Sequence, residues 1–327
     1  MARLGMVLHH GIEGGTALAG RARLAEWSGY DSLWVTERYF QEETFSLLGF
    51  LAAATQRIEL GVGVVNPYTR HPGLTAMAAA TADRLSGGRL LLGLGRSDPG
   101  MIEGTFGIPY ARPRETLAEA VDVIRRLLAG ETVDEPEGRS SLRNTRLAVT
   151  PMRPPPIYLA AIGPRALRLA GAVADGVLLN AYVPAEYVRY AVSEVRAGAE
   201  EAGREPEAVD IACMLVVRLT DDVASMLPQL RARLAGIMAE PYVGELMVDR
   251  GGVDLGDLDA LRAADAAGDR EAGALLVSDE VAEACTLVGD AGRISERVEE
   301  YVEAGVDHAL LLPRLPDFER VAEALAP

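Results

Sequence analysis

The sequence predicts an α/β fold of the (β/α)8 TIM-barrel type, and three observations lead to this prediction. Short apolar runs alternate with helical segments along the 327 residues, which is the pattern of a parallel sheet covered by helices. The helical segments place apolar residues on one face, for example at Leu117, Val121, Ile124 and Leu128. A doubly wound sheet is the alternative, but the first apolar run is not followed by a glycine-rich GxGxxG turn.

Each expected element has its own signal in the sequence. Strands are predicted where apolar and β-branched residues form runs too short for a helix, at residues 4–8, 32–36, 58–60, 89–94, 157–161, 176–179, 209–219 and 309–312. Helices are predicted between them where apolar residues recur at helical spacing, at residues 18–25, 44–54, 75–85, 117–128, 165–174, 187–202 and 294–301. Glycines such as Gly29 mark where a helix ends.

Two stretches depart from the alternation, and we expect them to be insertions in one barrel domain that covers residues 1–327. Residues 130–156 follow the fourth strand and its helix and are rich in charges and prolines, which predicts an exposed excursion with a short hairpin around residues 146–149. Residues 220–280 follow the seventh strand and are rich in Ala, Asp and Gly, which predicts a mostly helical insertion.

The composition excludes several classes of function. The net charge of −16 argues against sequence-independent binding of nucleic acid, although the basic residues, all of which are arginine, can still form a local anion site. No apolar run approaches the ~20 residues of a membrane helix, and the start of the chain lacks a signal-peptide pattern, so we expect a cytoplasmic protein. Cys213 and Cys285 lack metal-ligand spacing and are expected to be buried free thiols, and no metal site is predicted.

Residues 61–72, GVGVVNPYTRHP, form the most unusual loop of the chain. Gly61 and Gly63 suit a bulge or a close approach of backbones better than an ordinary strand interior. The prolines after Asn66 and His71 favour extended backbone at the preceding residues and stiffen the loop. A rigid structural loop would explain this pattern as well as a functional one.

This loop resembles the luciferase-like flavin and deazaflavin oxidoreductases, and within them the coenzyme F420-dependent branch of methylenetetrahydromethanopterin reductases. The resemblance implies a TIM barrel that binds F420 at the carboxyl ends of its strands and transfers hydride to or from a small organic substrate. It implies a cis peptide bond between Gly63 and Val64 behind the deazaflavin ring, with Asn66 nearby. Family members are often homodimers.

The resemblance also points to residues after the second strand. Similar proteins place an acidic residue and then a histidine there, near the reactive face of the ring, whereas this chain has Glu37 and Arg38. The resemblance makes Glu37 a cofactor contact. Arginine is a poor proton shuttle because its pKa exceeds ~12, but it could hold an anionic substrate or a reduced cofactor. A structural ion pair between the two residues is the alternative. The glutamate that these enzymes commonly carry on the first strand is also missing, since residues 6–8 are Met, Val and Leu.

Two further loops are expected to bind the cofactor. After the fourth strand, the sequence GLGRSD could direct backbone N–H groups at an anion, and the resemblance makes Arg96 and Ser97 cofactor contacts and Asp98 an acidic catalytic candidate. After the fifth strand, a proline opens a helix whose free N–H groups favour anions. By resemblance the cofactor phosphate binds there, near Gly163 and Arg165, and Ile162 is a further cofactor contact. A tight turn and an ordinary helix start are the alternatives for these loops.

Three hypotheses of function follow from the sequence. The first is an F420-dependent oxidoreductase acting on a small molecule, with Glu37, Arg38 and Asp98 as the catalytic candidates. The second is an FMN-dependent monooxygenase of the same fold that is supplied by a separate flavin reductase. The third is a non-catalytic cofactor-binding homologue, because two polar positions of the family are changed. The sequence does not identify the substrate.

Overall fold

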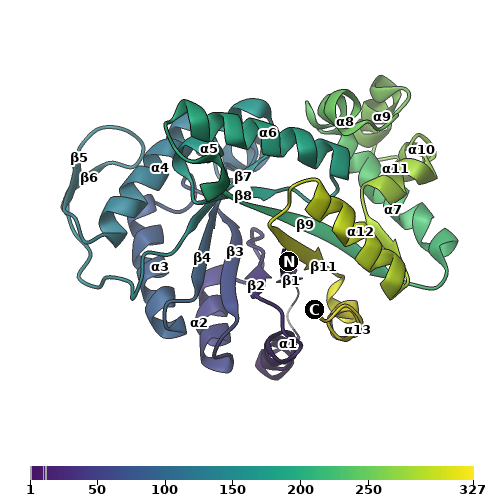
Figure 1. The fold of residues 1–327 in the computed structure, drawn as a ribbon. Coiled ribbons are helices and arrows are strands. Elements are labelled where there is room, and N and C mark those ends of the chain that lie inside the picture. Colours follow the sequence, from purple (N-terminus) through teal and green to yellow (C-terminus); the bar gives the residue numbers. More distant parts are fainter. Residues whose placement is uncertain (1, 10, 12) are drawn as a thin grey trace.

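The computed structural model describes residues 2–9, 11 and 13–327, and it confirms the barrel (Figure 1). Eight strands pair in parallel in the order β9-β11-β1-β2-β3-β4-β7-β8, and pairing of β8 with β9 closes the ring. These strands are β1 (Arg3–Leu8), β2 (Ser32–Val35), β3 (Glu59–Val65), β4 (Leu90–Leu94), β7 (Ile157–Ala161), β8 (Gly176–Leu179), β9 (Asp210–Leu219) and β11 (His308–Leu312).

Helices surround this ring, as the alternation in the sequence predicts. They are α1 (Gly15–Trp27), α2 (Thr44–Ala54), α3 (Pro72–Ser86), α4 (Pro113–Leu128), α5 (Pro164–Val173), α6 (Ala185–Glu201), α12 (Ala291–Glu303) and α13 (Phe318–Ala324). On α4, the four apolar residues that predicted the helix are all buried against the barrel. The largest core therefore lies between strands and helices, and helix periodicity encodes it.

A second, smaller core fills the inside of the barrel. It contains Trp34 and Tyr158, whose rings meet edge to face with centroids 5.4 Å apart. Side chains from seven different barrel strands contribute one residue each to the fully buried part of this core: Val7, Trp34, Leu91, Tyr158, Leu178, Ala212 and Leu310. The interior of the barrel is thus packed with side chains near the middle of the strands.

The two predicted insertions are present, but the hairpin lies earlier in the chain than expected. Its strands are β5 (Val133–Glu135) and β6 (Leu142–Thr145), whereas residues 146–149 form an irregular bend, so the prediction of a hairpin at 146–149 is wrong. The β6 strand escaped detection because two of its four side chains are exposed and its sequence, LRNT, has little apolar character.

The second insertion is helical, as predicted. It consists of α7 (Val223–Ala239), α8 (Val243–Gly251), α9 (Leu258–Ala266), α10 (Arg270–Leu275) and α11 (Asp279–Ala284), followed by a short strand β10 (Leu287–Gly289) that pairs with β9. Figure 1 shows these helices gathered on one side of the barrel, away from the β5–β6 hairpin. Among the residues that the structure describes, no helix is long and apolar enough to cross a membrane.

Candidate functional site

The β3 strand ends in a distorted segment that marks the carboxyl end of the barrel. The peptide bond between Gly63 and Val64 is cis, as the sequence resemblance predicted, and the pairing of β3 with β4 shifts register there. The neighbouring strand leaves room for this bulge because it carries glycine. A Cβ atom built on Gly93 would lie 2.1 Å from the carbonyl oxygen of Val62. The unusual glycine content of both strands therefore has a steric cause.

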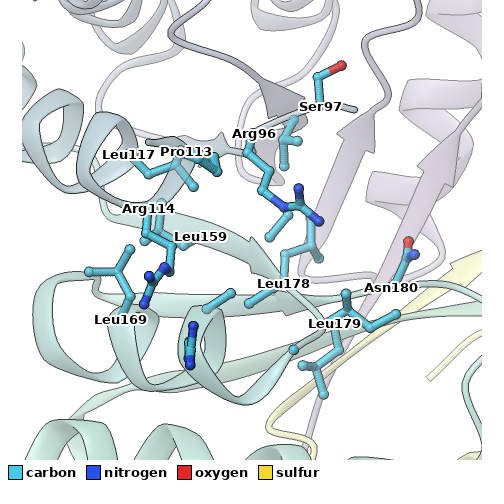
Figure 2. Close-up of a pocket in the computed structure, with 18 of the residues that line it drawn as sticks. Arg96, Ser97, Pro113, Arg114, Leu117, Leu159, Leu169, Leu178, Leu179 and Asn180 are labelled. Carbon is cyan, nitrogen blue, oxygen red and sulfur yellow. The ribbon is translucent and has the colours of Figure 1, made fainter. Parts of the chain in front are cut away.

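A cavity of about 830 Å³ opens beside this bulge, at the ends of β3, β4, β7 and β8 (Figure 2). Its volume lies in the range of sites for small molecules and cofactors. The cavity brings together most of the residues that the sequence proposed for cofactor binding, namely Gly63, Val64, Arg96, Ser97, Ile162, Gly163 and Arg165. Glu37, Arg38, Asn66 and Asp98 are not among the residues that line it.

The charged residues that line the cavity are all arginines. Arg96, Arg114 and Arg165 contribute to its wall, and none of the described lining residues is Asp or Glu. Figure 2 shows Arg96 reaching toward Leu178, while Arg114 lies beside Leu159 and Leu169. In a chain with a net charge of −16, three arginines make the wall of this cavity locally positive. The sequence analysis missed Arg114, since an arginine in a first helical turn carries no distinguishing signal.

The amino terminus of α5 lies in the same wall. Gly163 is the N-cap residue and provides no side-chain cap, and Pro164 begins the helix. The carbonyl of the preceding Ile162 accepts a hydrogen bond from the hydroxyl of Tyr187, which fixes the loop that leads into the helix. An uncapped helix start beside Arg165 favours an anionic group, as phosphate sites do.

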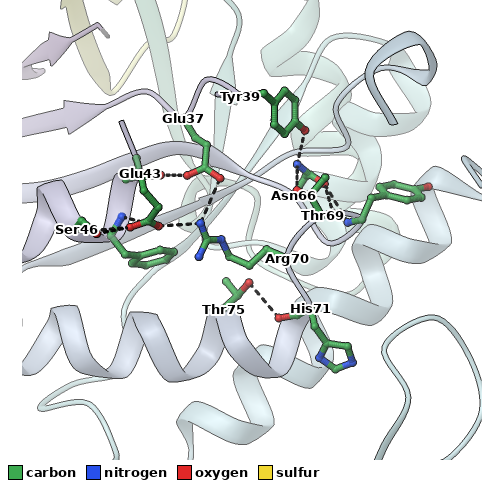
Figure 3. Close-up of polar contacts among 12 residues, drawn as sticks. Glu37, Tyr39, Glu43, Ser46, Asn66, Thr69, Arg70, His71 and Thr75 are labelled. Atoms are coloured by element: carbon green, nitrogen blue, oxygen red, sulfur yellow. Dashed lines mark hydrogen bonds and ion pairs between the residues drawn. The ribbon is translucent and has the colours of Figure 1, made fainter. Parts of the chain in front are cut away.

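Glu37 lies outside the cavity wall and takes part in a polar cluster with residues of α2 and the loop after β3 (Figure 3). Its carboxylate accepts a hydrogen bond from the hydroxyl of Thr44 and lies 3.4 Å from a guanidinium nitrogen of Arg70. Arg70 also pairs with Glu43 at 2.8 Å. Arg38 is exposed. The catalytic roles of Glu37 and Arg38 remain predictions, and these contacts show that Glu37 at least helps to hold two loops together.

Asn66 is connected to the cavity through hydrogen bonds (Figure 3). Its side-chain oxygen accepts from the backbone N–H groups of Tyr68 and Thr69, both at 3.0 Å, so its amide nitrogen must face the other way. That nitrogen donates to the hydroxyl of Tyr39 at 2.5 Å, and Tyr39 donates to the hydroxyl of Ser97 at 2.9 Å. Burial raises the pKa of Tyr39, so its phenol stays protonated and can act as this donor.

The loop after β4 forms the rim of the cavity. Asp98 is exposed, and its carboxylate accepts from the backbone N–H of Met101 at 2.9 Å in a short π-helix, η1 (Gly100–Thr105). Arg96 donates to the hydroxyl of Tyr110 at 2.6 Å, which braces its guanidinium. In Figure 2 the Ser97 hydroxyl points away from the Arg96 guanidinium, toward the outer edge. π-helical turns often occur at functional sites, and no pattern in the sequence predicts this one.

Among the described residues, no group of three or more His, Cys, Asp or Glu side chains is placed to hold a metal ion. His9 lies 3.1 Å from the Thr36 hydroxyl, and His10 lies outside the described residues. Cys213 and Cys285 are buried free thiols, as predicted.

Comparison with known proteins places the chain in a family. The sequence model of the luciferase-like monooxygenases matches residues 2–308. The 5,10-methylenetetrahydromethanopterin reductase of Methanolobus tindarius is 35% identical over 292 residues, which cover 88% of this chain and 87% of that protein. The F420-dependent glucose-6-phosphate dehydrogenase of Beutenbergia cavernae is 32% identical over 93% of this chain and 90% of its own length.

A solved structure agrees with these relatives. The coenzyme F420-dependent tetrahydromethanopterin reductase of Methanopyrus kandleri superposes with a TM-score of 0.86 at 28% identity, and the match covers 99% of this chain and 97% of that one. The resemblance inferred from the loop after β3 is thereby confirmed. The chain belongs to the luciferase-like monooxygenase family, and F420-dependent reductases and dehydrogenases are among its relatives.

Proposed function

We propose that this protein is an F420-dependent oxidoreductase that transfers hydride between the deazaflavin and a small organic substrate. The observation that carries the proposal is the cavity itself, in which a cis bulge, apolar walls and three arginines meet. A cofactor with a flat ring and an anionic tail matches this combination of surfaces. When bound, F420 supplies the two-electron hydride chemistry, while the barrel supplies orientation and electrostatics.

The roles of the lining residues follow from their positions. The Gly63–Val64 peptide would lie behind the ring, and Ile162, Gly163 and Arg165 would hold the phosphate at the start of α5. Arg96 and Ser97 would bind the cofactor from the loop after β4, with Asn66 acting on Ser97 through Tyr39. Glu37, Arg38 and Asp98 are the catalytic candidates on the substrate side, outside the cofactor cavity. A small-molecule substrate is expected, and its identity is open.

The phosphate assignment has a direct test in the substitution Arg165→Ala. Removing one charged hydrogen-bond donor from an anion site should weaken F420 binding about tenfold or more. The dissociation constant can be measured by titration that follows the fluorescence of the cofactor. Arg168→Ala is the matched control, because Arg168 lies one turn further along α5 and pairs with Glu194 at 2.7 Å instead of lining the cavity. An unchanged affinity of the Arg165→Ala protein would refute the assignment.

The second candidate function is an FMN-dependent monooxygenase supplied by a flavin reductase. It is retained because the family model that matches the chain is that of luciferase-like monooxygenases. The same cavity could hold a flavin phosphate, so binding selectivity decides between the two. A cofactor-binding homologue without turnover would bind F420 and leave its oxidation state unchanged with every substrate tried.

We further propose that the protein is a homodimer that associates through α2 and α3. Exposed apolar side chains occur on both helices, with Phe50 41%, Leu74 56%, Met77 53% and Leu85 61% accessible. The two helices meet where a Cβ atom on Gly49 would lie 3.8 Å from Leu85. Exposed apolar side chains that gather on neighbouring helices can mark an interface.

A further inference from the structure

Tyr242 is the residue that the second insertion contributes to the cavity. Among the described residues that line the cavity, it is the one that comes from the segment between β9 and β10. It precedes α8 with a φ of 76°, a backbone conformation that is uncommon for a tyrosine. Its side chain remains 51% exposed although the residue is aromatic. Tyr242 is half exposed, so packing in the barrel core does not account for its unusual backbone conformation.

The ring of Tyr242 lies against the N-cap of α5. A Cβ atom built on Gly163 would lie 3.1 Å from Cε1 of the tyrosine and 3.7 Å from its hydroxyl oxygen. The ring therefore covers the segment that also presents Arg165 and the uncapped helix start. A Cβ atom at position 163 would require the tyrosine ring to shift by a few tenths of an ångström.

Packing on α6 holds α8, the helix that begins directly after Tyr242. The guanidinium of Arg250 lies 5.1 Å from the ring centre of Tyr190 on α6. A Cβ atom on Gly251 would be 3.0 Å from Pro184, at the start of the same helix. Tyr187, also on α6, holds the carbonyl of Ile162 next to the anion site. One helix thus anchors both sides of the contact between Tyr242 and the loop before α5.

We propose that Tyr242 is a ligand-binding residue that covers the phosphate end of the cofactor cavity. Its ring excludes water from the start of α5, which strengthens the attraction of Arg165 and the helix N–H groups for an anion. Its hydroxyl donates a hydrogen bond to an oxygen of the bound phosphate. This inference rests on the proposed cofactor binding and assigns to the insertion a direct part in it.

Variants of Tyr242 separate the contribution of its ring to cofactor affinity from that of its hydroxyl. Tyr242→Ala should raise the dissociation constant for F420 about tenfold, mostly through faster dissociation, while Tyr242→Phe should raise it about threefold because only the hydroxyl is lost. Tyr182→Ala is the matched control. Tyr182 is also a tyrosine with positive φ, 65°, but it does not line the cavity, so its removal should leave the affinity unchanged.

A double-mutant cycle tests the contact itself. Gly163→Ala should weaken F420 binding in the native background, because the added methyl group displaces the tyrosine ring. In the Tyr242→Ala background the same substitution should have a smaller effect, since the ring is absent. Additive effects of the two substitutions on the binding free energy would contradict the proposed contact between Tyr242 and Gly163. Thermal unfolding of each variant checks that the proteins are folded.

A second probe distinguishes failure of this inference from failure of the proposed function. Inorganic phosphate should raise the unfolding temperature of the native protein more than that of Tyr242→Ala. If the native protein binds phosphate in this way but not F420, the proposed cofactor is wrong and the role of Tyr242 stands. Equal responses of the native and Tyr242→Ala proteins to both probes, including no response, would overturn the role of Tyr242.

Discussion

At the scale of single residues, His308 should make the free energy of unfolding fall in acid. The side chain is fully buried inside the barrel, with Nε2 2.8 Å from the Ser32 hydroxyl. Burial and the nearby charge of Arg3 lower its pKa to about 3. In the unfolded chain a histidine titrates near ~6.5, so unfolding takes up a proton at intermediate pH. The contribution of neutral His308 to the free energy of unfolding is therefore present above pH ~6.5 and is lost as the pH falls toward 3.

The substitution His308→Gln removes this titration. Urea unfolding between pH 7.5 and 5 should show that the native protein loses free energy of unfolding more steeply below pH ~6.5, by up to about 1.4 kcal/mol per pH unit, than the variant does. Parallel pH profiles for the two proteins would show that His308 is not the group responsible.

The sequence identified site residues where the backbone imposes a recognisable local pattern. Gly63 and Val64 lie in a loop with two glycines and two prolines, and Arg165 follows a proline that opens a helix. Arg114 and Tyr242 had no such signal, because their places in the cavity depend on how a helix and an insertion pack against the barrel. Pairwise contacts between loops are set by the tertiary fold, and the sequence of either loop alone does not contain them.

At the scale of elements, the fit between β4 and the bulge of β3 should be intolerant of any added atom. Gly93→Ala would place a methyl group 2.1 Å from the Val62 carbonyl oxygen and 2.9 Å from Val64 Cγ1. Because one obstacle is backbone, relief requires the strands to move, and we expect a loss of about 3 kcal/mol in the free energy of unfolding together with weaker cofactor binding.

Gly20→Ala provides the matched control for this prediction. Gly20 lies within α1, and a Cβ atom there would meet nothing within 4 Å. Alanine should stabilise that helix by about 0.5–1 kcal/mol, since it restricts the unfolded chain and favours helix. Chemical denaturation of the two variants measures both effects, and a Gly93→Ala protein as stable as the native one would refute the steric account.

The elements themselves were predictable to different degrees for physical reasons. Long amphipathic helices such as α4 have clear periodicity, and a buried strand such as β9 stands out as a long apolar run. The prediction of α2 agrees with the structure at both ends. The hairpin was misplaced because its strands are short and largely exposed. The π-helix η1 and the short helix α13 were missed, since one or two turns give too few residues for a periodic signal.

At the scale of the whole molecule, the exposed apolar side chains of α2 and α3 predict self-association. A charged residue within this group of apolar side chains, as in Leu85→Glu, should shift the protein from dimers to monomers, because burying an unpaired carboxylate is costly. Analytical ultracentrifugation measures the change. Leu275→Glu is the control, since Leu275 is 75% exposed on α10 in the insertion and lies away from α2 and α3. A native protein that sediments as a monomer at micromolar concentration would contradict the proposal.

The central claim, that this barrel binds F420 for hydride transfer, is tested most directly by titrating the purified protein with F420 and, separately, with FMN while following fluorescence. The account predicts micromolar or tighter binding of F420 and much weaker binding of FMN. It also predicts that the arginine-lined cavity gives this binding a dependence on ionic strength. Preference for FMN would contradict the claim and favour an oxygen-using monooxygenase. Binding of neither would mean that the cavity serves another ligand.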